Sequence, residues 1–400
     1  MVSVGIDVSK GKSTVCLMKP FGEIVVGPME IVHVESELKT LVKLMKSMNG
    51  EVKVVMEATG IYHLPVLTYL KDNGIFTAVI NPYQMKQYRV QSLRRVKTDR
   101  ADSMIIAKYG LDNWDELRDY VNSEDDKYRE LSLLSRQYRH YMRLHVTSLQ
   151  ELTHILDYTM PGIKKEFNSW GRGSGKDKLS DFVEHYWHYD IIRKKSERQF
   201  AESYLKWAKN KGYHRNQNKA AKIYSMAKEG IPTLPADQTT KMLVTQAIGV
   251  MRRVDETLNT ILARMQEVAK ALPEYPVVRS MGGVGDVLDP KLIANIGDVR
   301  RFHNSKALIA YAGIDAPPYQ SGQFTGTNRN ISKRGSSAIR KTGYEVMQSL
   351  KSHPMPLDAA VYQFMLKKEA EGKPKKVAKM AGLNKFLRIY YARVMEVYNY

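Results

Sequence analysis

Apolar strand-like segments alternate with helix-like segments in the first quarter of the chain, and their order restricts the possible folds. β-Branched and apolar runs bounded by turn residues predict strands at residues 2–8, 13–18, 22–33, 52–56 and 76–80. Apolar residues at helical spacing predict helices over residues 35–48, 61–70 and 102–111. This βββαβαβ order, followed by the last helix, predicts a mixed α/β domain in this part of the chain.

Four carboxylates lie within or at the ends of these elements. Asp7 and Glu57 belong to apolar strand segments, and Asp99 and Asp102 are three residues apart at the start of a helix. A carboxylate in an apolar strand is costly to bury unless it binds a cation or is otherwise paired. Asp7 alone could simply cap the following turn. Four converging carboxylates, however, form a hard-oxygen site for Mg²⁺ or Mn²⁺, as in two-metal phosphodiester chemistry.

The chain is strongly basic. It has 400 residues, with 62 Lys and Arg against 42 Asp and Glu, and a formal charge of +20. This excess points to a polyanion, most simply nucleic acid. A membrane surface is the weaker interpretation, because no apolar run reaches the roughly 18 residues that span a bilayer.

The compartment is inferred from the start of the chain and from its cysteine content. A core-strand pattern begins at Val2, so no signal peptide is expected. Cys16 is the only cysteine, which excludes an internal disulfide framework and a cysteine-based zinc cluster. These features favour a cytoplasmic location.

Two long apolar seams follow the α/β region, each with spacings of three or four residues. The first seam consists of Leu131, Leu134, Tyr138, Tyr141, His145, Leu149, Leu152 and Leu156. The second consists of Leu243, Ala247, Val250, Val254, Leu258, Ile261, Met265, Val268 and Leu272. Coiled-coil helices require such spacing, so we expect an antiparallel hairpin that could also serve as a dimerisation arm.

These patterns predict three domains, at residues 1–125, 126–272 and 273–400. The middle domain carries an aromatic and basic insertion at 161–235 between the two seams. Gly171–Lys176 within this insertion lacks the spacing of a nucleotide phosphate loop. The last domain is predicted to be mostly helical.

Seven short motifs resemble the DEDD transposases of bacterial insertion sequences, also called bridge-RNA-guided recombinases. Four motifs are similar to the family's RuvC-like, ribonuclease-H-like domain: Gly5-Ile-Asp7-Val-Ser-Lys10, Glu57-Ala-Thr-Gly60, Ile80-Asn-Pro82 and Lys97-Thr-Asp99-Arg-Ala-Asp102. Three are similar to its C-terminal transposase domain: Ala310-Tyr-Ala-Gly313, Tyr319-Gln-Ser-Gly322 and Ile331-Ser-Lys-Arg-Gly335. The chain departs from the family in its long insertion and at Gly285-Asp-Val-Leu-Asp-Pro290, where a helix–hairpin–helix continuation is usual.

The resemblance implies a mechanism and partners. It implies that Asp7, Glu57, Asp99 and Asp102 bind Mg²⁺ or Mn²⁺, and that Ser321 is the nucleophile of a recombinase that forms a phosphoserine intermediate. It further implies that Ser321 of one protomer works with the carboxylates of another, in a dimer that assembles into a tetramer. A noncoding guide (bridge) RNA would pair with both target and donor DNA. From its Ser-Gly context alone, Ser321 is a turn residue.

Basic residues near these motifs are predicted to contact nucleic acid. They are Arg94, Arg95, Lys97, Arg329, Lys333, Arg334, Arg340 and Lys341. The alternative for each of them is an ordinary solvated surface.

Three other functions fit part of the pattern. A Holliday-junction endonuclease would use the same carboxylates with water as nucleophile and would not need Ser321. A sugar-kinase or actin-like ATPase also has an Asp after its first strand, but the basic charge and the missing adenosine motif argue against it. A catalytically idle scaffold would bind nucleic acid without any metal dependence.

Overall fold

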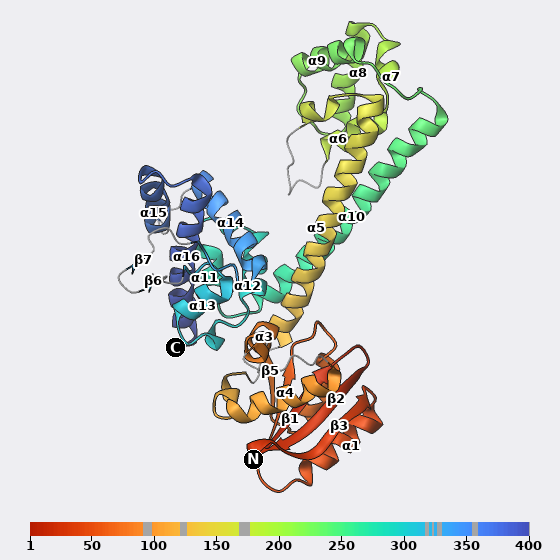
Figure 1. Ribbon diagram of the computed structural model, residues 1–400. Coiled ribbons are helices and arrows are strands. Elements are labelled where there is room, and N and C mark those ends of the chain that lie inside the picture. The colour runs from red at the N-terminus through yellow and green to blue at the C-terminus, as the bar shows by residue number, and fades with distance from the viewer. Residues whose placement is uncertain are drawn as a thin grey trace. The chain divides into compact units, whose positions relative to one another are not determined.

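The computed structural model divides into two compact units, Met1–Glu124 and Asp125–Tyr400 (Figure 1). It describes residues 1–90, 98–120, 126–167, 177–316, 320–321, 324–325, 330–353 and 359–399. No helix in these ranges is long and apolar enough to cross a membrane. The predicted division after residue 272 falls inside the second unit and stays a prediction.

The first unit is built on a mixed sheet with strand order β3-β2-β1-β4-β5. The strands are β1 (Val2–Val8), β2 (Lys12–Lys19), β3 (Glu23–Val32), β4 (Val52–Glu57) and β5 (Thr77–Ile80). β1, β2 and β3 form an antiparallel meander, whereas β4 and β5 continue the sheet parallel to β1. This is the ribonuclease-H-like arrangement, so the predicted α/β fold is confirmed.

The two faces of this sheet are covered by different helices. Side chains alternate along a strand, and the even-numbered residues of β1 pack with α1 (Glu35–Lys46) and α2 (Leu64–Asp72). The odd-numbered residues face α4 (Asp99–Asp112). A short helix that the sequence analysis did not predict, α3 (Pro82–Val90), follows β5.

The second unit contains a hairpin of two long helices, α5 (Asp126–Thr159) and α10 (Gln238–Lys270). The helices are antiparallel, since the early residue Glu130 of α5 binds the late residue Arg264 of α10 at 2.7 Å. The predicted coiled-coil hairpin is therefore confirmed. The seam on α5 is also right, because its residues are buried or partly buried.

The predicted seam on α10 is wrong at two positions in its first half, while Ala247 and Val254 there are partly buried as predicted. Val244, Ile248 and Met251 are buried there, whereas Leu243 and Val250 are exposed. The buried row packs into the core of the insertion as well as against α5, and this packing selects the row one residue further along. From Leu258 to Leu272 the predicted seam residues are buried or partly buried.

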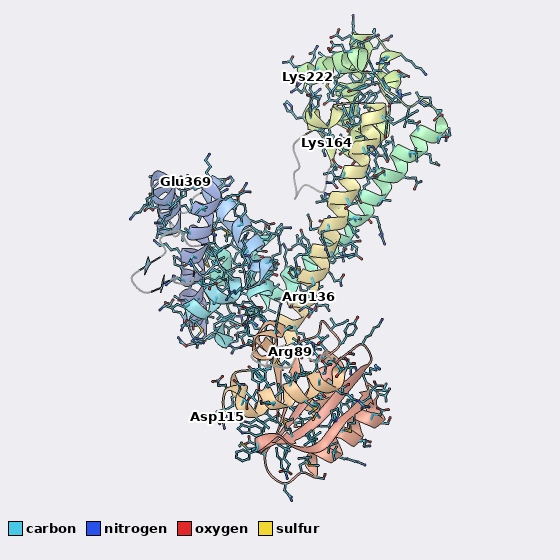
Figure 2. The ribbon with its side chains drawn as sticks, viewed as in Figure 1. Arg89, Asp115, Arg136, Lys164, Lys222 and Glu369 are labelled. Atoms are coloured by element: carbon cyan, nitrogen blue, oxygen red, sulfur yellow. The ribbon has the colours of Figure 1, made fainter. Side chains whose placement is uncertain are left out.

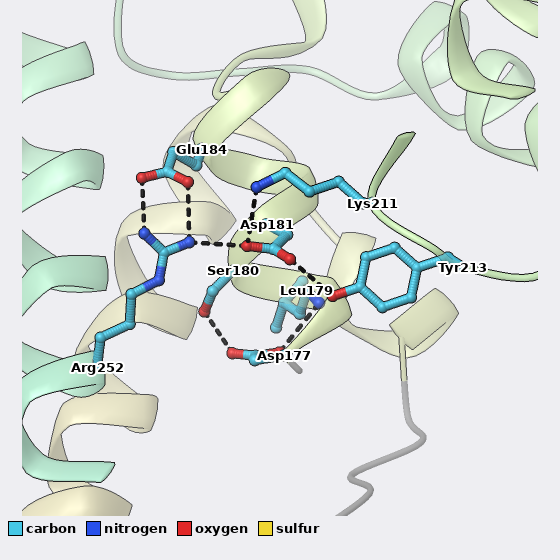
Figure 3. A network of polar contacts seen from close by, with 8 residues as sticks. All are labelled: Asp177, Leu179, Ser180, Asp181, Glu184, Lys211, Tyr213 and Arg252. Atoms are coloured by element: carbon cyan, nitrogen blue, oxygen red, sulfur yellow. Dashed lines mark hydrogen bonds and ion pairs between the residues drawn. The ribbon is translucent and has the colours of Figure 1, made fainter. Parts of the chain in front are cut away.

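The insertion folds into small helices at the end of the hairpin. They are α6 (Lys178–His185), α7 (Tyr189–Arg193), α8 (Glu197–Asn210) and α9 (Gln217–Glu229). Its aromatic side chains form a core in which Phe182 lies 4.8 Å from Phe167 and 5.6 Å from Trp207, measured between ring centroids. Arg252 of α10 fastens α6 to the hairpin through Glu184 at 2.7 Å and Asp181 at 2.9 Å (Figure 3).

The remaining helices of the second unit share a core with the base of the hairpin. They are α11 (Tyr275–Ser280), α12 (Leu288–Ile296), α13 (Ser305–Ala312), α14 (Ser337–Ser352), α15 (Ala359–Ala370) and α16 (Lys375–Tyr398). Between α13 and α14 lies a two-strand ribbon of β6 (Gln320–Ser321) and β7 (Phe324–Thr325). The predicted, mostly helical third region is thus confirmed.

Candidate carboxylate site

Asp7 and Glu57 lie at the same edge of the sheet because β1 and β4 run parallel. The register pairs Ile6 with Met56, so Asp7 and Glu57 are the next residues along two neighbouring strands. Ile6 and Met56 are buried against α1 and α2, and the alternation of side chains therefore turns both carboxylates toward α4.

The start of α4 brings Asp99 and Asp102 to this edge. The helix begins at Asp99, where the hydroxyl of Thr98 accepts a backbone hydrogen bond at 3.1 Å. It packs directly on β1 at Gly5, where an added Cβ would lie only 2.2 Å from the carbonyl oxygen of Ser103. Glycine therefore permits the close approach. Asp102 is buried in this arrangement, whereas Asp99 is exposed.

A cation from α3 contacts two of these carboxylates. Nη2 of Arg89, labelled in Figure 2, donates to Oε2 of Glu57 at 3.0 Å. Its Nε lies 3.6 Å from Oδ1 of Asp102. One guanidinium therefore neutralises part of the charge of two predicted metal ligands. Sequence patterns did not single out Arg89, whose only signal was that it belongs to the basic stretch before the acidic pair.

The carboxylates influence one another electrostatically. The pKa of Asp7 is raised from 3.8 to about 6, first by burial and then by the charges of Asp102 and Asp99. Burial also raises the pKa of Glu57, while Arg89 opposes that shift. Mutual repulsion of this kind means that an added cation would stabilise the ionised forms.

The four carboxylates have the chemistry that a hard divalent cation requires, but in the structure they are not placed to hold one together. In the ranges described above, no three Asp, Glu, His or Cys side chains are placed to hold a metal ion as they stand. Carboxylate oxygens are nevertheless the ligands that Mg²⁺ and Mn²⁺ prefer. Arg89 already contacts one oxygen of Glu57 and one of Asp102. Convergence of the four ligands on an ion stays a prediction.

Ser321 belongs to the second unit. It lies in β6 and pairs with Phe324 of β7. Its side chain lies outside the described residues, and its role as nucleophile stays a prediction.

The predicted nucleic-acid contacts fall into two groups. Three of the predicted contact residues lie within the described ranges and have exposed side chains: Lys333, Arg334 and Lys341. Arg340 is half-buried instead, and its Nη1 donates to the carbonyl oxygens of Ala312 at 2.9 Å and Gly335 at 3.0 Å. This guanidinium therefore links the end of α13 to the segment just before α14, which the sequence did not indicate. Outside the described residues lie Arg94, Arg95, Lys97 and Arg329.

Two protein-family models match the chain, one in each half. The model of the DEDD transposases of the IS110 group, described as "Transposase", matches residues 4–161. The model described as "Transposase IS116/IS110/IS902 family" matches residues 275–363. The predicted carboxylates lie in the first match and Ser321 lies in the second.

Two insertion-element proteins agree with these matches. An insertion element IS116 protein of Streptomyces clavuligerus is 21% identical over 371 residues, which cover 92% of this chain and 88% of that protein. An insertion element IS110 protein of Streptomyces coelicolor is 22% identical, over 80% of this chain and 77% of that protein. A solved RuvC from T. thermophilus in complex with a Holliday junction covers 29% of this chain and 96% of its own, at 13% identity and a TM-score of 0.23.

A RuvC-like α/β domain followed by a largely helical transposase domain defines a DEDD transposase, an enzyme that acts on DNA. The chain belongs to the IS110/IS116 family of insertion-sequence transposases. The resemblance found in its motifs is thereby confirmed.

Proposed function

We propose that this transposase cuts and rejoins DNA through a phosphoserine intermediate, with Mg²⁺ or Mn²⁺ held by Asp7, Glu57, Asp99 and Asp102. The observation that supports the metal site most directly is the placement of Asp7 and Glu57 at the same edge of the sheet, with Asp102 linked to Glu57 through Arg89. The raised pKa of Asp7, caused first by burial and then by the charges of Asp102 and Asp99, agrees with this crowding of acids. A bound divalent ion would supply Lewis-acid stabilisation of charge on the attacked phosphate.

Ser321 is the proposed nucleophile. Its Oγ would form an ester bond to the scissile phosphorus while the bond to the leaving deoxyribose oxygen breaks. The serine proton is lost and the leaving oxygen gains one, so one phosphate ester is exchanged for another. The energy of the diester is kept in the serine ester, and a second exchange can rejoin the strand without ATP.

The proposed partners are target and donor DNA, a noncoding guide (bridge) RNA and further copies of this chain. The family assignment supports action on DNA. Guidance by RNA rests on the motif resemblance, and sequencing the RNA that copurifies with the protein would test it directly.

The experiment that tests the chemistry is a denaturant-resistant adduct assay. Wild-type protein quenched during the reaction should yield protein joined covalently to a DNA end. Ser321→Ala should lose the adduct but keep DNA binding, because binding comes mostly from phosphate contacts. Asp7→Ala and Glu57→Ala should also lose the adduct, because the charge stabilisation of the transition state is removed.

The water-using endonuclease is the competing function, and the same assay separates the two. Cleavage without any adduct in the wild type would favour hydrolysis. An adduct that persists in Ser321→Ala would transfer the nucleophile's role to another hydroxyl, such as that of Ser336 or Ser337.

A further inference from the structure

One face of α5 carries a row of arginines. They are Arg129, Arg136, Arg139 and Arg143. At about 100° per residue they fall within a sector of roughly 80° on the helix surface. Arg139 is half-buried and the other three are exposed; Figure 2 labels Arg136. We call this surface the α5 arginine face.

The same sector contains no carboxylate from residue 129 to residue 154, and Asp157 in the last turn of α5 is the first acid in it. The other positions that helical spacing places there are Ser132, Thr147, Gln150 and His154. Each of these side chains can donate a hydrogen bond. The sector is therefore a continuous surface of donors with a positive charge at one end.

The arginines of this face differ from those of the facing helix in their partners. On α10, Arg253 binds Glu256 at 3.0 Å and Arg264 binds Glu130 at 2.7 Å. Arg252 binds Glu184 and Asp181, as Figure 3 shows. By contrast, among the residues that the structure describes, no acid forms an ion pair with any of the four α5 arginines.

Among the described residues, no acid relieves the repulsion within the α5 arginine face. The pKa of Arg139 is lowered by burial and then by the charges of Arg136 and Arg143. Its Nε is buried and has no hydrogen-bond partner among the described residues. A row of like charges without internal counter-charges favours an external polyanion.

We infer that the α5 arginine face binds the phosphate backbone of duplex DNA. Arg129, Arg136 and Arg143 are spaced by seven residues and so extend over about 21 Å of helix, the length of roughly six base pairs. A guanidinium pairs with phosphate in a bidentate manner, and hydroxyl and amide donors also bind phosphate oxygens. We name DNA as the ligand because the family acts on DNA. The inference does not depend on the proposed role of Ser321.

The test measures affinity for a short DNA duplex over a salt series with EDTA present, so that no cleavage is needed. The variant Arg129→Gln/Arg136→Gln/Arg143→Gln should weaken binding. The slope of log affinity against log salt should become shallower by about 2 to 3, since each phosphate contact contributes roughly 0.9. All three side chains are exposed, so the hairpin should keep its helical circular dichroism.

The matched control removes three acid-paired arginines, Arg198, Arg253 and Arg264, by the same change to Gln. It alters the net charge equally and should leave the slope unchanged. Replacing the three α5 residues with Lys should restore most of the wild-type slope.

Two results would overturn the inference. The first is an equal change of slope in the α5 variant and the control, which would reduce the effect to net charge. The second is a change of slope with an RNA duplex but none with DNA. Both are binding results, so they are independent of any failure of the adduct assay.

Discussion

Arg89 is the side chain that most affects how the candidate metal site can work. Its guanidinium lies 3.0 Å from Glu57 and 3.6 Å from Asp102, so it holds two carboxylates that the resemblance assigns to metal. An ion pair in place of a metal keeps buried acids ionised at less cost. At the residue scale, Arg89 and a divalent ion would compete for the same two carboxylates.

Arg89→Ala is expected to tighten Mn²⁺ binding roughly fivefold to tenfold, because two partly buried ion pairs of about 1 kcal/mol or less no longer oppose the ion. Isothermal titration calorimetry on the metal-free protein measures this without any DNA. Arg89→Lys keeps the charge and is the control, with affinity near wild type. Equal Mn²⁺ affinity in wild type and Arg89→Ala would show that the arginine does not compete.

Asp289 illustrates a buried acid outside the candidate site. It is fully buried in α12, its Oδ2 accepts from the hydroxyl of Tyr275 at 3.3 Å, and Nε of Arg279 lies 3.6 Å away. Burial raises its pKa from 3.8 to about 6, with Arg279 opposing the shift. The native state therefore holds this proton more tightly than the unfolded chain does.

The pH dependence follows from that difference. Between about pH 4 and pH 6 the native state binds more protons at Asp289, so its contribution to the unfolding free energy falls as pH rises. Asp289→Asn should remove this fall. The unfolding free energy of the variant relative to wild type should therefore be higher at pH 7 than at pH 4, by roughly 1–3 kcal/mol. Urea unfolding at the two pH values measures the effect. An identical pH profile in the variant would contradict the assignment to Asp289.

At the scale of elements, the contact between β1 and α4 positions the carboxylates. Gly5 allows this contact, because a Cβ there would lie 2.2 Å from the carbonyl oxygen of Ser103 and 2.3 Å from the backbone nitrogen of Ala107. Any side chain at residue 5 must push α4 away from the strand. The acids Asp99 and Asp102 would move with it.

Gly5→Ala is therefore expected to destabilise the first unit by roughly 1–3 kcal/mol and to weaken Mn²⁺ binding. Urea unfolding and calorimetry measure the two effects. Gly27→Ala is the matched control, since nothing lies within 4 Å of the Cβ that would be added to this glycine of β3. Equal effects of the two substitutions would show that the space around Gly5 does not position α4.

At the scale of the whole molecule, the predicted catalytic residues are divided between two units. Asp7 belongs to Met1–Glu124 and Ser321 belongs to Asp125–Tyr400. This division is compatible with active sites assembled from different protomers, as the motif resemblance implies. Recombination would then require an oligomer.

Mixing Ser321→Ala with Asp7→Ala should restore part of the recombination activity that each variant lacks alone. In a mixed oligomer, one site can combine an intact Ser321 from one chain with an intact Asp7 from its neighbour. Gel analysis of recombined DNA measures the effect, with each variant alone as the control. No recovery in oligomers shown to be mixed would favour active sites built within single chains.

The local pattern of the sequence was sufficient for the succession of strands and helices in the first unit and for the two long helices of the hairpin, because each depends on periodicity and spacing within a few residues. The first half of the α10 seam could not be read in the same way, since α10 has two adjacent apolar rows and the insertion core selects the one with Val244 and Ile248. Arg89 and Arg340 acquired their partners through contacts between segments far apart in the chain. Spacing shows which face of an element a side chain occupies, but only packing of distant segments determines which charge lies opposite it.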